Sequence, residues 1–326
     1  MGPQPAVVVS EEVRAARADG LPVVALETSV VTGGRYPDNL ETALAVDAAA
    51  REEGAVPARV AVIDGRFRVG VEDAELERLA AGPVDGKLST RDLAHALHGG
   101  LTGGTTVSSS LIATVAAGVS VFAVAGIGGV HRGAETSFDV STDLDQFTRS
   151  PVAVVCAGAK SLLDPGLTLE YLETVGVPVI GYRSDDFPGY YTRSTGHRVP
   201  HRLDRLEDVV GVMHRHWGLV AGSSVLVTHP IAEEWSLDAD LLDRLVEEAL
   251  AEARREGASG AGLTPFVLSA ISKATDGRSG AVNRAVLLST TRLAARLAVA
   301  EAEVLGAASD GPSVRAGAAP AGAVAP

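Results

Sequence analysis

The sequence contains little cysteine, few aromatic residues and no excess of basic charge. Its single cysteine, Cys156, excludes an internal disulfide and fits a reducing compartment, where we expect the thiol to be a small buried hydrophobe. A formal net charge of -13 argues against a surface for nucleic acid or an anionic membrane, which needs clustered Lys and Arg. No apolar stretch approaches the ~18 residues of a membrane span, and the start lacks a basic segment followed by a long apolar one. We therefore predict a cytoplasmic protein with no membrane or nucleic-acid partner.

What the chain does contain is apolar side chains in short runs. With 46% hydrophobic and 21% charged residues, its 326 residues can bury a large core. None of the runs alternates apolar with polar residues, which is typical of parallel strands buried on both faces. Longer stretches of helical period separate them, so the sequence predicts an α/β fold with a largely parallel sheet covered by helices. The predicted strands are 22–26, 60–63, 121–124, 152–155, 177–180 and 225–227.

Three helices have readable ends. Asp38 is placed to cap one that stops before Gly54, a second spans 237–256 before Gly257, and a last long helix spans 281–305. We expect residues 1–306 to form a single catalytic domain and the Ala/Gly/Pro-rich tail 307–326 to be disordered. The stretch 184–216, rich in Tyr, Arg and His, interrupts the α/β alternation and is predicted to be a lid or an oligomer contact.

Polar residues directly after the apolar runs are the first candidates for chemistry, because ligands bind beyond the carboxyl ends of parallel strands. Glu27 follows one run, the loop 126–132 with His131 follows another, and Lys160 comes four residues after a third. Singly, a strand-end Glu often caps a helix and a Lys usually faces water. Together they favour a desolvated lysine that attacks a carbonyl carbon, with Glu27 moving protons on and off the imine.

Two further motifs each allow both a ligand-binding and a purely structural interpretation. The Gly-Gly-Thr-Thr segment 103–106 opens a helical stretch and either binds a phosphate near Thr106, with Lys87 as the countercharge, or is an ordinary glycine turn. Asp139, Asp143 and Asp145, with Glu135 upstream, either hold a Mg²⁺ or Mn²⁺ ion through one carboxylate and several waters, or form a capped, solvated turn. Leu144 and Ser150 stand where a calcium loop needs glycine and glutamate, which excludes an EF-hand.

Long strings of the sequence resemble the pseudouridine-5'-phosphate glycosidase family. They are EEGAVPARVAVIDGRFRVG, AGIGGVHRGAETSFDVSTDL, VAVVCAGAKSLLDPGLTLEYLETVGVPVIGY and LTPFVLSAI, and the resemblance covers nearly the whole chain except the tail. It implies a homotrimeric three-layer α/β/α enzyme that breaks or makes the C–C bond between uracil and ribose 5-phosphate.

The resemblance also implies a role for individual residues. Lys160 matches the imine-forming lysine, Glu27 the proton-transfer acid and Asp139 the ligand of Mn²⁺ or another divalent cation. The resemblance places Lys87, Val107, Ser141, Thr142, Asp143 and Asn283 in substrate binding, and we predict that Thr106 and His131 also contact the substrate.

The segment after Glu27 departs from the family pattern: it lacks a histidine and carries Gly33 and Gly34, which we expect to open space for a larger ring. Three hypotheses follow. The chain is a pseudouridine 5'-phosphate glycosidase, a C-glycosynthase that attaches ribose 5-phosphate to an aromatic aglycone in antibiotic biosynthesis, or a non-catalytic binder of sugar phosphates. The presence of both Lys160 and Glu27 disfavours the binder.

Overall fold

Every predicted apolar run overlaps a strand of the protein. The computed structural model describes residues 7–257 and 262–309. Its strands are β1 (Val7–Val9), β2 (Val23–Leu26), β3 (Val56–Ile63), β4 (Arg66–Val69), β5 (Gly86–Leu88), β6 (Gly103–Thr105), β7 (Val121–Ala123), β8 (Val130–His131), β9 (Ala153–Cys156), β10 (Leu163–Asp164), β11 (Val179–Tyr182), β12 (His201–Leu203) and β13 (Val225–Thr228).

One branched sheet runs through the molecule in the order β1-β4-β3-β2-β7-β9-β13-β11-β12. From β3 to β12 every neighbouring pair is parallel, as predicted. The branch lies on β3, whose first half pairs with β2 and whose second half pairs antiparallel with β4 and β6. Strand β5 then pairs in parallel with β6. The carboxyl ends of β2, β7 and β9 therefore meet at one edge.

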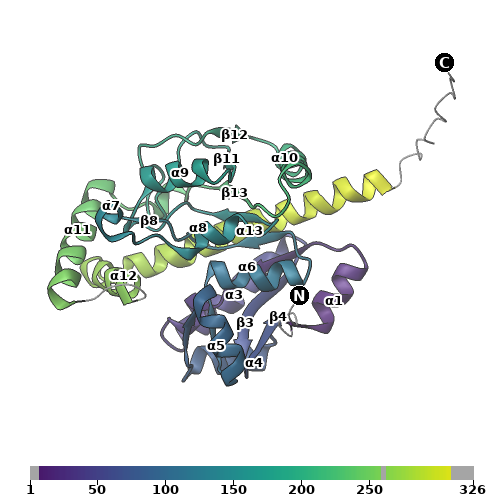
Figure 1. Cartoon of the computed structure of the whole chain (residues 1–326), viewed down its shortest axis with the longest axis horizontal. Coiled ribbons are helices and arrows are strands. Elements are labelled where there is room, and N and C mark those ends of the chain that lie inside the picture. Colours follow the sequence, from purple (N-terminus) through teal and green to yellow (C-terminus); the bar gives the residue numbers. More distant parts are fainter. Residues whose placement is uncertain (1–6, 258–261, 310–326) are drawn as a thin grey trace, which may run out of the picture.

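Helices cover both faces of the sheet. On one face α13 contacts β2, β7 and β9 and packs against α3 and α10; on the other, α6 contacts β2, β3 and β4 and packs against α8. Figure 1 shows α13 as the long helix that crosses the molecule and extends past its body. Strands β2, β7, β9 and β13 are buried along their whole length, which explains their continuous apolar sequences. The fold is thus a three-layer α/β/α arrangement.

The helices have the following bounds: α1 (Glu11–Ala18), α2 (Ser29–Thr32), α3 (Asp38–Glu52), α4 (Asp73–Ala81), α5 (Leu93–Gly99), α6 (Val107–Ala116), α7 (Ala134–Ser137), α8 (Thr142–Phe147), α9 (Pro165–Thr174), α10 (Leu206–Leu219), α11 (Ala239–Glu256), α12 (Leu263–Ala274) and α13 (Arg278–Ser309). Two short 3₁₀ turns, η1 (Thr90–Asp92) and η2 (Glu233–Trp235), accompany them among the described residues.

The predicted helix ends were partly correct. Helix α11 stops at Gly257, which is left-handed (φ 72°), and the Asp238 side chain caps its start by accepting from the Leu241 N–H at 2.7 Å. Asp38 is not a cap, because α3 already includes it and no side chain caps that helix. Helix α13 runs through Gly306 to Ser309, past the predicted boundary of the tail, and residues 310–326 lie outside the described residues.

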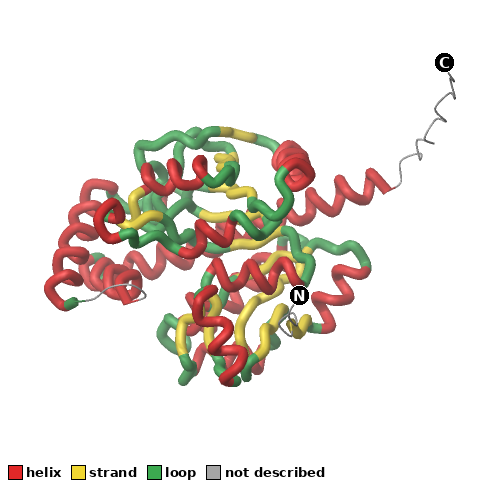
Figure 2. Tube along the Cα trace, viewed as in Figure 1, coloured by secondary structure: helices red, strands yellow, loops and turns green. Residues whose placement is uncertain are grey.

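The stretch 184–216 contains an irregular segment, strand β12 and most of helix α10 (Figure 2, green leading to β12). Its Tyr190 and Tyr191 are each only 3% exposed, so this segment packs into the protein rather than covering it as a loose lid.

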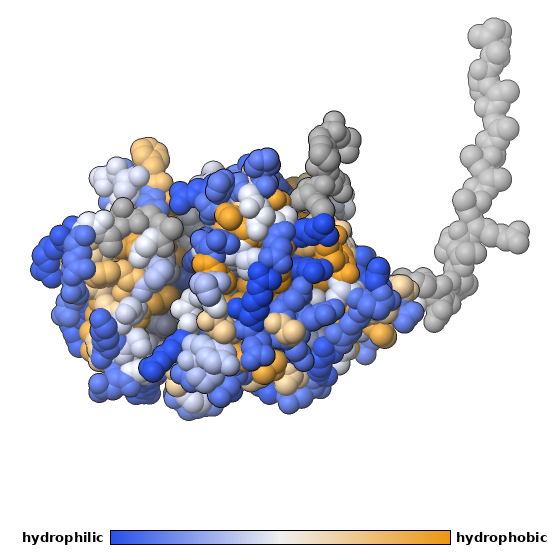
Figure 3. All heavy atoms as spheres, turned by 90° about the horizontal axis from the view of Figure 1, so that it is seen from below, coloured by the Kyte–Doolittle hydropathy of each residue, from blue (hydrophilic) through white to orange (hydrophobic). Residues whose placement is uncertain are grey.

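Among the described residues, no helix is both long and apolar enough to cross a membrane. Figure 3 shows one face of the molecule, on which hydrophilic residues are spread widely with apolar residues between them.

Candidate active site

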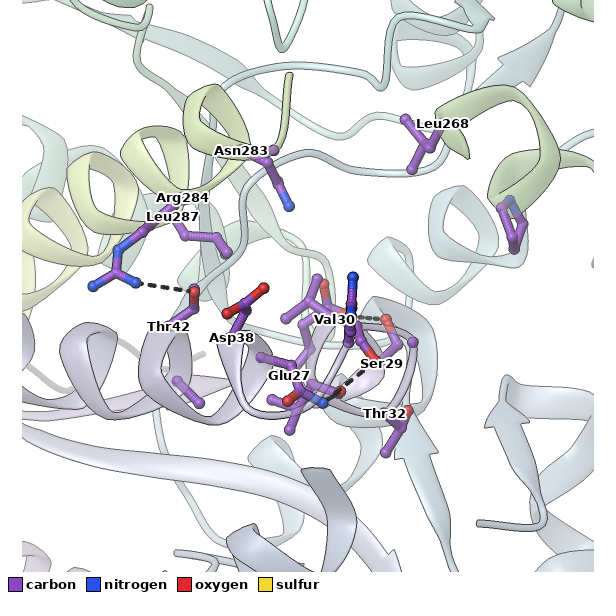
Figure 4. A pocket seen from close by; sticks show the side chains of 18 of the residues that line it. Glu27, Ser29, Val30, Thr32, Asp38, Thr42, Leu268, Asn283, Arg284 and Leu287 are labelled. Carbon is purple, nitrogen blue, oxygen red and sulfur yellow. Dashed lines mark hydrogen bonds between the residues drawn. The ribbon is translucent and has the colours of Figure 1, made fainter. Parts of the chain in front are cut away.

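Glu27 and Lys160 come from different strands and line one cavity. Glu27 directly follows β2, and Lys160 follows β9 by four residues. The cavity has a volume of about 700 Å³, within the range of ligand sites. Figure 4 shows Glu27, Ser29 and Val30 on one side of the opening and Asn283 and Leu268, from α13 and α12, facing them. The predicted meeting of the two residues at one sheet edge is present in the structure.

Buried hydroxyl groups hold the chain around Glu27 in place. The Thr28 hydroxyl donates to the carbonyl of Val60 at 2.7 Å and accepts from the N–H of Thr105 at 3.1 Å. The Thr105 hydroxyl donates to the same Val60 carbonyl at 2.6 Å. These bonds tie the end of β2 to β3 and β6, so the direction in which Glu27 leaves the sheet is fixed.

Glu27 has the electrostatics of an acid/base group. Its side chain is 5% exposed, and burial raises the pKa of the carboxyl. The positive charge of Lys160 and the hydrogen bond from the Ser29 hydroxyl oppose this rise without cancelling it. A carboxyl with a raised pKa holds a proton at a higher pH than usual and can give it to a substrate.

Lys160 and Lys87 place two amines near this carboxyl. The main chain of Lys160 is anchored by its N–H, which donates to the Ile127 carbonyl at 3.1 Å. Lys87 lies on β5, and its pKa is lowered first by burial and then by the charge of Lys160. Both side chains line the cavity with Glu27. Two close amines suit a substrate that carries a carbonyl carbon at one end and a phosphate at the other.

The Gly-Gly-Thr-Thr segment is not the ordinary glycine turn of one interpretation, while the phosphate site near Thr106 stays a prediction. Residues Gly103–Thr105 form strand β6 and not a turn, and Thr106 caps helix α6. The N–H of Thr106 donates to the Leu88 carbonyl at 3.0 Å, and that of Ser108 donates to Asp143 Oδ1 at 3.0 Å. These two donors are bonded within the protein, and Lys87 is the cation that lines the cavity near them.

Asp143 ties three segments together beside the cavity. It is 5% exposed; one oxygen accepts from Ser108 as above, and Oδ2 accepts from the N–H of Gly128 at 2.8 Å. The Ser141 hydroxyl accepts from the N–H of Asp143 at 3.2 Å. At the start of α6, the Ser108 hydroxyl lies 3.1 Å from the Thr142 hydroxyl and 3.0 Å from the Thr106 hydroxyl. The predicted residues Thr106, Val107, Ser141, Thr142 and Asp143 thus gather here, and Asp143 is near enough to shift the pKa values of Glu27 and Lys87.

Asp139 and His131 form a separate pair close to Lys160. His131 Nδ1 lies 3.7 Å from Asp139 Oδ2 and is buried without a hydrogen bond. Burial lowers the pKa of His131, Asp139 opposes this, and Lys160 adds to it. The described residues contain no group of three or more His, Cys, Asp or Glu able to enclose a metal ion. The Asp139 side chain is 37% exposed, so it fits only a hard cation that is held by one carboxylate and completed by water.

The predictions overlooked three residues of the cavity wall. Tyr190 and Tyr191 come from the segment predicted to be a lid or contact, and Arg59 lies at 3% exposure beneath Glu27. Arg59 donates to the Ala43 carbonyl at 2.6 Å and to Asp47 at 2.9 Å. Asn283, which was predicted, also lines the cavity. The paired tyrosines after Phe187 and Pro188 were the available signal for a buried wall.

Comparison with known proteins gives this arrangement a family. A family model described as "Indigoidine synthase A like protein" matches residues 12–300. The chain belongs to this family.

Its relatives include pseudouridine-5'-phosphate glycosidases. That of Dickeya dadantii is 51% identical over 297 residues, covering 91% of this chain and 94% of the relative. That of Methylobacterium nodulans is 47% identical over 317 residues, covering 97% and 93%.

Two solved members of the family share the fold. The prealnumycin C-glycosynthase AlnA, in complex with ribulose 5-phosphate, superposes with a TM-score of 0.87 at 39% identity and covers 94% of this chain and 100% of its own. An indigoidine synthase A-like protein of Thermotoga maritima superposes with a TM-score of 0.82 at 30% identity, covering 92% and 97%.

Proposed function

We propose that this chain cleaves the C–C glycosidic bond of pseudouridine 5'-phosphate, with water, to uracil and ribose 5-phosphate. The observation that carries the proposal is that Lys160, Glu27 and Lys87 line the same cavity at the carboxyl ends of the strands. The Dickeya and Methylobacterium relatives named for this activity match this chain over nine tenths of its length or more.

The chemistry follows from the substrate, because a C-glycoside has no oxygen leaving group that an acid can simply protonate. In the proposed reaction the C–O bond at the anomeric carbon breaks, and its electron pair stays on the ring oxygen, which takes up a proton. The amine of Lys160 bonds to that carbon and gives up a proton. The nitrogen lone pair then forms an imine as the C–C bond breaks, and the bond's electron pair stays on the base carbon, which takes up a proton.

Glu27 is the group placed to move these protons, because its buried carboxyl has a raised pKa and lies in the same cavity. Water hydrolyses the imine, frees Lys160 and releases ribose 5-phosphate. In this proposal Lys87 holds the phosphate throughout, and the base lies toward Asn283, which faces Glu27 across the cavity (Figure 4).

A C-glycosynthase is the second candidate, since the reverse reaction passes through the same imine. The likeness to AlnA, a C-glycosynthase solved with ribulose 5-phosphate, supports it. In this second proposal the chain would join ribose 5-phosphate to an aromatic aglycone in antibiotic biosynthesis. Gly33 and Gly34, which we expect to open space for a larger ring, both line the cavity. A Cβ on Gly34 would lie 2.6 Å from the Cβ of Asn39, and one on Gly33 would lie 3.0 Å from the Ser29 carbonyl oxygen. Close packing against Asn39 therefore requires glycine at position 34, whereas position 33 is tight without requiring it, and neither contact decides between the two candidates.

The test is to incubate the protein with pseudouridine 5'-phosphate and measure free uracil and ribose 5-phosphate. Release of both in equal amounts supports the glycosidase. No release, together with C–C product from ribose 5-phosphate and an electron-rich aromatic acceptor, supports the synthase. A protein that binds the sugar phosphate but gives no borohydride-trapped adduct on Lys160 is a binder only.

We also propose that Asp139 holds Mn²⁺ or a similar hard cation, with His131 beside it, and that the active form is a cytoplasmic homotrimer. Such an ion supplies positive charge that neutralises phosphate or hydroxyl oxygens of the bound sugar. Activity measured with and without added Mn²⁺, and the mass of the particle in solution, test these two points.

A further inference from the structure

Tyr190 has an unusual backbone conformation. Its φ is 67°, in the left-handed region that bulky residues rarely occupy. Its N–H donates to the Ala157 carbonyl at 2.8 Å, and the neighbouring residues Gly158 and Gly189 form an antiparallel bridge. This segment, far from β9 in sequence, is therefore fastened to the stretch that leads from β9 to Lys160. Residues in sparsely populated conformations gather at functional sites when the surroundings enforce them.

The ring of Tyr190 is packed so closely that it cannot turn away. A Cβ on Gly126, three residues after β7, would lie 2.3 Å from the ring atom Cδ2, so this position has to be glycine for the ring to fit. On another side, the Tyr191 ring meets it edge-on, with centroids 4.5 Å apart at 63°. Packing at this density fixes the position of the hydroxyl group.

That hydroxyl donates a hydrogen bond to Oδ1 of Asn283, on α13. Burial raises the pKa of Tyr190 well above its usual value, so the phenol keeps its proton and acts as a donor. The carboxamide oxygen of Asn283 thus accepts from Tyr190, and its NH₂ group can donate to a ligand in the cavity. Figure 4 shows the Asn283 nitrogen directed from α13 toward the side where Glu27 lies.

We propose that Tyr190 is a specificity-determining positioning residue, which holds Asn283 so that its NH₂ donates to a carbonyl oxygen of the bound base. The inference rests on the proposed function, because it assigns this wall of the cavity to the base. The selected class is a base with carbonyl acceptors on its outward edge. A base that presented only N–H donors would meet the wrong group, and buried polar groups left unpaired discriminate strongly.

The test uses Tyr190→Phe, Asn283→Ala and the double variant, with Tyr182→Phe as the matched control. Tyr182 is also a buried tyrosine, 7% exposed, but lies outside the cavity lining. Each protein is assayed for uracil release from pseudouridine 5'-phosphate and for the rate at which borohydride traps ribose 5-phosphate on Lys160. We expect Tyr190→Phe to lower kcat/KM by about tenfold, mainly through KM, and to leave trapping within about twofold of the wild type. The double variant should be no worse than Asn283→Ala alone.

Three results would overturn the inference: unchanged uracil release in Tyr190→Phe, an equal loss in trapping, or losses that multiply in the double variant. An equal loss in Tyr182→Phe would also overturn it, since any buried hydroxyl would then matter. Uracil binding to the borohydride-reduced ribose 5-phosphate adduct separates this inference from the proposed function. Suppose that the wild type releases no uracil, but that its reduced adduct binds uracil about tenfold more tightly than the reduced adduct of Tyr190→Phe. The proposed function then fails while the role of Tyr190 stands. A wild-type adduct that does not bind uracil contradicts the inference.

Discussion

Lys160 and Glu27 lie close enough for the charge of the lysine to lower the pKa of the glutamic acid, yet burial raises that pKa by more. The balance leaves a carboxyl group with a raised pKa in the same cavity as an amine. An amine that attacks the sugar and an acid that protonates the leaving carbon are what an imine mechanism needs. The two groups come from β2 and β9, which are separated in the sheet only by β7.

Replacing Lys160 by Ala should abolish uracil release and remove the borohydride adduct, because the other amine of the cavity, Lys87, is assigned to the phosphate and not to the anomeric carbon. Binding of ribose 5-phosphate should persist, since Lys87 remains in the cavity. Turnover assays, intact mass after reduction and calorimetry measure these three outcomes. Lys273→Ala, which removes an exposed lysine from α12, is the control and should behave as the wild type does. Full turnover in Lys160→Ala would refute the imine.

Replacing Glu27 by Gln should slow uracil release by about 10²- to 10⁴-fold, the usual cost of losing an acid/base group. The same variant tests the pKa. A raised pKa in the folded protein means that folding is disfavoured as pH rises from the unfolded value of 4.5 through the folded value, because the buried carboxyl must then ionise.

Glu27→Gln should therefore match the wild type in Tm at pH 4 and exceed it increasingly toward neutral pH. Thermal unfolding across this range measures the difference. A constant gap in Tm at every pH would show that the carboxyl has no raised pKa.

The sheet and its two central residues could be predicted because their signals are local in the sequence. Fully buried strands read as apolar runs, and Glu27 and Lys160 are recognised by their distance from those runs. Gly103 and Gly104 were misinterpreted because a strand that contains glycine looks like a turn. Here a Cβ on Gly103 would lie 2.4 Å from the Gly86 carbonyl oxygen, so the close approach of β5 and β6 is what requires glycine.

The wall of the cavity could not be predicted, because it depends on contacts between distant segments. Tyr190 and Asn283 are 93 positions apart, and nothing near either residue indicates that their side chains meet. Likewise, a buried arginine such as Arg59 is recognisable only once Ala43 and Asp47 of α3 are seen beside it. For Asp143 the sequence located the residue but not its hydrogen bonds.

Those hydrogen bonds change what is expected of Asp143→Asn. Both carboxylate oxygens accept from main-chain N–H groups, so an amide nitrogen at either position would face a donor. We expect a loss of about 1–3 kcal/mol in the free energy of unfolding. Activity should fall by one common factor whichever base is tested, because the aspartate supports the structure of the site and does not contact the base. Urea unfolding and assays with several bases measure this.

Asp145→Asn is the control for that prediction. Its carboxylate is exposed and pairs with Arg149 at 2.8 Å, so its removal should change stability by no more than about 1 kcal/mol. A shift in base preference in Asp143→Asn, with stability unchanged, would return this residue to the group that contacts the base.

Replacing Asp139 by Ala tests the cation. Because this carboxylate is the ligand we assign and the described residues offer no enclosing cluster around it, affinity for Mn²⁺ should fall at least tenfold, which corresponds to about 1.4 kcal/mol. Titration of Mn²⁺ followed by calorimetry in the presence of ribose 5-phosphate gives that affinity directly, without relying on turnover. Glu135→Gln, on neighbouring α7, is the control and should bind Mn²⁺ as the wild type does. Equal affinity in Asp139→Ala and the wild type would mean that the ion, if it binds, is held elsewhere, and that Asp139 serves only to accompany His131 at 3.7 Å.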